Sequence, residues 1–160
     1  MMYLVVGLVA LLASGLTFFS GFGLGTLLMP AFALFFPVDV AVAMTAVVHL
    51  LNGLFKLVLV GREIDRRVAV RFGVPAVAAA MLGARLLVWL AALPALHTYT
   101  AFGRTLQITP AGLGVGVLML LFAFVELAPG VKKLAIDPRY LPLGGLVSGF
   151  FGGLSGHQGA

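Results

Sequence analysis

Four polar residues share one face of a predicted helix in an otherwise apolar part of the chain. They are Thr45, His49, Asn52 and Lys56, within a helix predicted from about Val40 to Val60. At 100° per residue they fall within about 60° of arc. Imidazole and ammonium groups attract anions and an amide donates hydrogen bonds, so this polar stripe predicts a path for anions. In the alternative interpretation, Lys56 extends toward the adjacent charged loop and the others bond to neighbouring helices.

Two glycine-rich stretches could bring backbone N–H groups to the same ligand. The first is Ser20–Gly25 and the second is Ser148–Gly156. Each glycine weakens a helix by about 1 kcal/mol relative to alanine. Opened helix ends expose N–H groups, which suit anions. The candidate helix-break glycines are Gly21, Gly23, Gly25, Gly152, Gly153 and Gly156. They could equally be small-residue packing points between helices.

The second glycine-rich stretch runs into two further polar residues, His157 and Gln158. They are candidate substrate contacts, or else part of a frayed tail. The chain has no HExxH zinc motif, no GxSxG elbow and no GxxxxGK[ST] nucleotide loop, and its five acidic residues are scattered. We therefore expect neither an enzyme nor a bound cofactor or metal.

The elements that position these residues are expected to lie in a membrane. Of 160 residues, 62% are hydrophobic and 9% charged, whereas soluble domains carry about a quarter charged residues. Residues 1–38 contain no charged side chain, and roughly 20 such residues already cross a bilayer. The net charge of +5 comes from basic residues scattered in short connections, which argues against nucleic-acid binding. There is no cysteine.

Apolar periodicity and turn residues divide the chain into several membrane segments. The first run, residues 3–36, exceeds the membrane thickness as one helix and should break near the first glycines, with Pro30 as a second weak point. Asp39 is the predicted N-cap of the helix that bears the polar stripe. The remaining predictions are a helix over 68–93, a hairpin or interfacial loop over 97–109, a helix from Pro110 capped by Thr109, and a segment from Leu141.

Basic loops predict the orientation. The loops at residues 61–71 and 129–141 are rich in Arg and Lys, whereas 94–110 has only Arg104. Two crossings separate the basic loops, so both are expected on the cytoplasmic side of a multi-pass plasma (inner) membrane protein. Trp89, near the outer end of its helix, is either an interfacial anchor or a packed core residue.

The two glycine-rich stretches lie about 130 residues apart and resemble each other, as in duplicated transporter bundles. This predicts an all-α, polytopic transmembrane bundle with glycine-broken helices. Residues 1–140 would form the first repeat and residues 141–160 the start of a second, truncated one.

The sequence resembles the sulfite-exporter family of membrane permeases, TauE/SafE. The segments that carry the resemblance are Ser20–Gly25 with Pro30, Asn52–Lys56 leading into Gly61–Asp65, Pro75–Leu86 (PAVAAAMLGARL), and Ser148–Gly159 ending in SGHQG. The resemblance implies an inner-membrane secondary transporter of small anions such as sulfite, thiosulfate-like or sulfonate species.

Family members look like two related halves, and this chain resembles a first half plus the start of a second. The expected partners are the lipid bilayer, a small anionic substrate, and a complementary half or a second copy of the chain, but not nucleic acid. The alternatives are a membrane assembly subunit that transports nothing, or an inactive truncated fragment.

Overall fold

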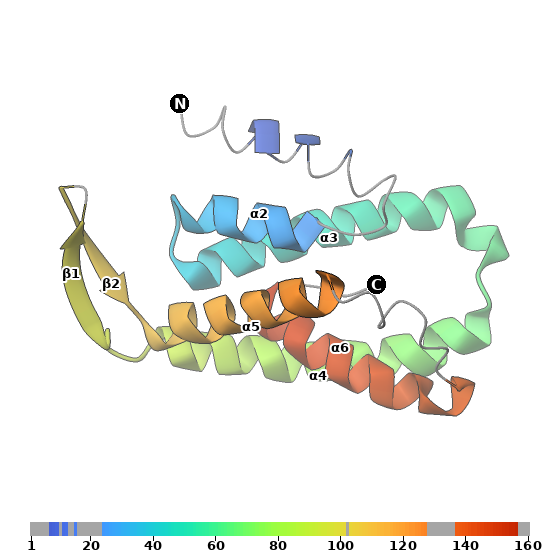
Figure 1. Ribbon diagram of the computed structural model, residues 1–160. Helices are drawn as coiled ribbons and strands as arrows, with labels where there is room; N and C mark the ends of the chain where they lie inside the picture. Colours follow the sequence, from blue (N-terminus) through green and yellow to red (C-terminus); the bar gives the residue numbers. More distant parts are fainter. Residues whose placement is uncertain are drawn as a thin grey trace.

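The computed structural model describes residues 7–9, 11–12, 15, 24–101, 103–127 and 137–156, which form long helices and one hairpin. Figure 1 shows the helices running alongside one another, with the hairpin at one end of the bundle. The elements are α2 (Leu24–Ala33), α3 (Val38–Val60), η1 (Gly61–Glu63), α4 (Arg66–Ala91), β1 (His97–Ala101), β2 (Arg104–Ile108), α5 (Pro110–Leu127), η3 (Pro138–Tyr140) and α6 (Leu141–Ser155).

Two helical stretches of the described chain, Val38–Glu63 and Arg66–Ala91, are long and apolar enough to cross a bilayer. A core helix of a soluble protein would also be apolar, but it would be mostly buried. Here only 11% and 17% of the most apolar window of each is buried. A shorter apolar helix, Pro110–Val125, follows. Long apolar helices with exposed surfaces are those of a helical membrane protein.

The residues at the starts of α3 and α4 explain where these helices begin. The predicted N-cap of α3 was wrong, because Pro37 holds that position and Asp39 lies in the first turn. A carboxylate there still interacts favourably with the helix dipole. For α4 the cap is Asp65, whose carboxylate accepts hydrogen bonds from the backbone N–H groups of Arg67 (2.8 Å) and Val68 (3.3 Å). Pro75 lies inside α4 without ending it.

The hairpin predicted over residues 97–109 is confirmed. Strands β1 and β2 are antiparallel, with Tyr99 opposite Leu106 and Ala101 opposite Arg104. Gly103 has φ of 71°, a left-handed conformation that glycine adopts without steric cost.

Thr109 caps α5 as predicted. Its side-chain oxygen accepts a hydrogen bond from the Gly112 N–H at 3.0 Å, and Pro110 takes the first helical position, where its missing N–H costs nothing.

We expect Thr109→Ala to lower the free energy of unfolding by about 1 kcal/mol, because one N–H at the start of α5 loses its acceptor. Thermal unfolding in detergent, followed by circular dichroism, measures the change. Thr109→Ser keeps the hydroxyl and should remain close to the parent. Equal destabilisation by serine and alanine would show that the methyl group, not the cap, is what matters.

Helices α4 and α6 pack in parallel at very close range. A Cβ atom added at Gly145, Gly149 or Gly153 would collide with the carbonyl oxygen of Phe72, Ala76 or Ala80, respectively. The contacting residues rise together along both helices, so α4 and α6 run in the same direction. The spacing of four residues places the three glycines along one side of α6. We call this contact the glycine seam.

The glycine seam has a topological consequence. Because α4 and α6 run the same way, both begin at one end of the bundle, and the hairpin lies at the other (Figure 1). The charged turn at 61–65 and the turn at 137–140 therefore share an end of the molecule. The buried core lies between these helices and α3 and α5, and includes Val42, Leu87, Val115 and Leu154.

Candidate functional site

The polar stripe lies on the side of α3 that is turned into the molecule. Thr45 is fully buried, and His49, Asn52 and Lys56 are half-buried. Apart from Val48, which is half-buried, the residues between them are exposed, as Leu51 (61%) shows. The inward side of α3 is thus apolar at its start, and from Thr45 onward it includes the polar stripe beside Val48. This placement is what lining residues require, because polar groups inside a membrane face a bundle interior or water.

The stripe meets the second glycine-rich stretch at Thr45. Gly156 ends α6 with φ of 69°, and its N–H donates to the Gly152 carbonyl oxygen at 2.8 Å. A Cβ added at Gly156 would lie 3.4 Å from the Val42 carbonyl oxygen and 3.5 Å from the Thr45 Cβ. The polar stripe and the second glycine-rich stretch therefore come together in the fold. His157 and Gln158 lie outside the described residues.

Among the described residues, one glycine that was predicted to break a helix does end one: Gly156, at the end of α6. Gly152 and Gly153 lie within α6, which continues to Ser155, so the prediction of a break at these two residues was wrong. Gly153 belongs to the glycine seam, and close packing on α4 offsets its low helix propensity. Gly25 lies in the first turn of α2, one residue after its start. Gly21 and Gly23 are outside the described residues.

The helix end that reaches Thr45 is a carboxyl end. The sequence suggested that opened helix ends would present N–H groups to an anion, but the end of α6 presents carbonyl groups instead. The Thr45 hydroxyl donates to the Ala41 carbonyl oxygen at 2.8 Å. Its proton is therefore engaged within α3. In this conformation Thr45 packs against the end of α6, and the donors suited to an anion are farther along the stripe.

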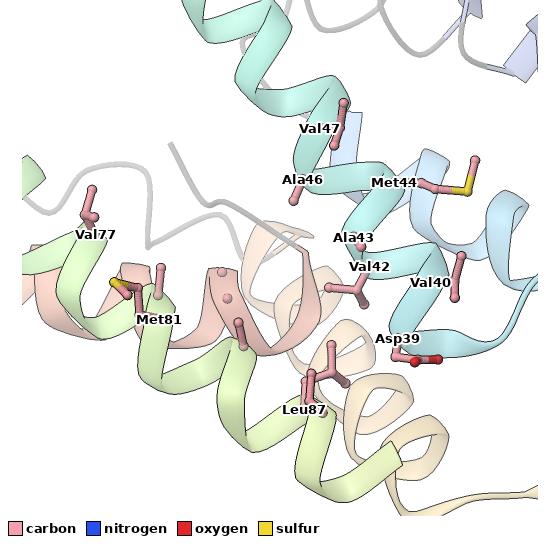
Figure 2. A pocket seen from close by; sticks show the side chains of 15 residues that line it. Asp39, Val40, Val42, Ala43, Met44, Ala46, Val47, Val77, Met81 and Leu87 are labelled. Carbon is pink, nitrogen blue, oxygen red and sulfur yellow. The ribbon is translucent and has the colours of Figure 1, made fainter. Parts of the chain in front are cut away.

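A separate pocket of about 750 Å³ lies between α3, α4 and α6. Figure 2 shows its apolar side chains, with Asp39 at the start of α3. Asp39 is the one charged residue among those that line it, and none of the stripe residues does. A carboxylate repels anions and an apolar wall cannot replace their hydration, so this pocket is not suited to an anion. The sequence did not predict it, because its walls come from segments far apart in the chain.

Residues 5–160 match the family described as sulfite exporter TauE/SafE. The chain belongs to the TauE/SafE family. The match confirms the resemblance inferred from the sequence and extends over nearly the whole chain. No curated protein and no solved structure matches the chain. As a TauE/SafE protein it is an integral membrane protein of a permease family, and members of that family are transporters rather than enzymes.

One feature of this TauE/SafE chain was missed in the sequence although its signal was present. Gly145, Gly149 and Gly153 recur every four residues, the spacing that lets two membrane helices approach closely. Gly149 and Gly153 belong to the second glycine-rich stretch, and helix packing was the alternative interpretation for Gly153. The four-residue spacing would have predicted a packing face instead.

Proposed function

We propose that this chain lines the path of a small anion, such as sulfite or a related sulfur-containing anion, across the inner membrane. The observation that carries the proposal is the inward placement of Asn52 and Lys56 on α3 in a member of a permease family. An amide and an ammonium group are hydrogen-bond donors suited to an oxyanion.

Charge is distributed unevenly along α3. Lys56 lies in its last two turns, close to Arg62 in the following turn, whereas Asp39 lies in its first turn. About 25 Å of helix separates Lys56 from Asp39. An anion is therefore attracted at the end with the basic turns, which we assign to the cytoplasm on the positive-inside rule.

The crossing of α6 over Thr45 is the proposed gate. Gly156 lies against Val42 and Thr45, at the place where the stripe passes from half-buried to fully buried. The glycine seam holds α6 on α4 with no side chain between the backbones, so these two helices are expected to move together. Movement of the α4–α6 pair relative to α3 would then open and close the path.

Anion flux into vesicles tests the function. The protein is purified from membranes in mild detergent with whatever chain stays bound, and is reconstituted into liposomes. We expect entry of radiolabelled sulfite above that of protein-free vesicles, and no comparable entry of a cation such as choline. A membrane assembly subunit would give no sulfite flux. Absence of flux from correctly inserted protein, with its bound partner present, would overturn the proposal.

A further inference from the structure

The hairpin has two chemically different faces. Residues directly opposite each other in an antiparallel pair point to the same face. One face carries the pairs His97–Ile108 and Tyr99–Leu106 and, next to the turn, Ala101–Arg104. We call it the apolar face after Tyr99, Leu106 and Ile108. The polar face carries the pairs Thr98–Gln107 and Thr100–Thr105. Every residue on the polar face has a hydroxyl or an amide. The apolar face has the large side chains of Tyr99, Leu106 and Ile108, with His97 at one of its ends and Arg104 at the other.

The apolar face is left exposed by the described part of the chain. Tyr99 is 43% exposed, Leu106 38% and Ile108 37%. Removing such side chains from water is favourable by roughly 25 cal/mol for each Å² covered. A two-stranded hairpin is also marginal by itself in water. Both facts favour a surface on which the apolar face rests.

The position of the hairpin identifies that surface. It connects α4 to α5, and Figure 1 shows it lying across the end of the bundle rather than along the helices. Since α4 is long enough to cross the bilayer and ends at Ala91, the hairpin begins where the membrane ends. Its base is closed by a hydrogen bond of 2.8 Å from the Leu96 N–H to the Ile108 carbonyl oxygen.

Trp89 lies near the end of α4 from which the hairpin follows. It lies two residues before the end of α4 and is 60% exposed, so of the two interpretations of this residue the packed core is wrong. Exposed tryptophan and tyrosine gather at the boundary between lipid and water. The outer edges of the strands still need water for their unpaired backbone groups, which excludes a position deeper in the hydrocarbon.

We propose that the hairpin lies flat on the lipid surface at this end of the molecule. Its apolar face rests on the boundary between headgroups and acyl chains, and its polar face points to water. We assign the apolar face to lipid rather than to another protein because the hairpin follows the end of a helix long enough to cross the bilayer, with the exposed Trp89 near that end. This binding surface does not depend on the proposed transport.

Tryptophan fluorescence tests the proposal, because Trp89 is the only tryptophan in the chain. In a Trp89→Phe background, Tyr99→Trp places the probe on the apolar face, and Thr98→Trp is the matched control on the polar face. Each protein is reconstituted into phosphatidylcholine–phosphatidylglycerol vesicles. We expect the probe at 99 to emit at shorter wavelength and to be quenched by lipids brominated near the headgroup. The probe at 98 should be quenched by aqueous iodide instead.

Two results would overturn the proposal. Strong iodide quenching at both positions would place both faces in water. Protection of position 99 from iodide and from brominated lipid together would show that protein covers the apolar face. A second pair, Leu106→Trp and Gln107→Trp, lies on the opposite strand and must give the same contrast. It keeps the test decisive if replacing Tyr99 disturbs the hairpin.

Discussion

Replacing Gly149 by alanine is expected to destabilise the folded chain by about 2 kcal/mol, the cost of overpacking a close contact. The added Cβ would meet the carbonyl oxygen, carbonyl carbon and Cα of Ala76, all of them backbone atoms that no rotamer change can move. Helices α4 and α6 would have to separate along the whole glycine seam. Alanine raises helix propensity by about 1 kcal/mol, but this gain is smaller than the loss of packing.

Gly144 provides the matched control. It lies in the same helix, and a Cβ added there would meet only the Phe72 ring at 3.8 Å, an ordinary contact. Gly144→Ala should therefore be neutral or stabilise the chain by up to about 1 kcal/mol. Thermal unfolding of both variants in the same detergent measures the difference. Equal stability of the two variants would mean that the helices do not approach as closely as the seam requires.

Loss of the Lys56 charge is expected to reduce sulfite flux about tenfold, which corresponds to about 1.4 kcal/mol. A charge–charge interaction near a protein surface is worth up to about 4 kcal/mol at close range, and water in the path weakens it. Flux into proteoliposomes with equal amounts of inserted protein measures the effect of Lys56→Gln. Lys56→Arg keeps the charge and should retain most of the flux.

A general effect of surface potential must be separated from a contact in the path. Arg62 lies in η1, a short distance beyond Lys56 along the chain, and its side chain is exposed. Arg62→Gln removes the same charge from the same end of the molecule but should change the flux little. If Arg62→Gln reduces flux as much as Lys56→Gln, the relevant property is the total charge at this end of the molecule. Unaltered flux in Lys56→Gln would remove Lys56 from the path altogether.

Features with a local cause were predictable from the sequence. The hairpin followed from alternation around Gly103, and the start of α5 followed from Thr109 and Pro110, whose hydrogen bond and dihedral preference act within a few residues. The family could also be recognised from the glycine-rich and charged segments, and the family match over residues 5–160 confirms it. For the hairpin and the start of α5, the determining residues are neighbours in the chain.

Features that depend on contacts between distant segments could not be predicted from the sequence. Gly152 and Gly153 have low helix propensity, yet both lie within α6, where Gly153 packs against the backbone of Ala80 on α4. The apolar pocket is lined by residues of three helices, so no single segment of the sequence predicts it. The stripe on α3 was visible as a periodic pattern, but its meeting with Gly156 depends on how α6 crosses α3.

The parallel arrangement of α4 and α6 also fixes an order of assembly on the ribosome. Ala76 is synthesised well before Gly149, its neighbour across the seam. Roughly 70 residues separate them, which at about 5–20 residues per second means a delay of several seconds. The chain must also cross back through α5 before α6 can arrive. During that interval the side of α4 that later packs on Gly145, Gly149 and Gly153 has no α6 to contact, so we expect lipid or the insertion machinery to cover it.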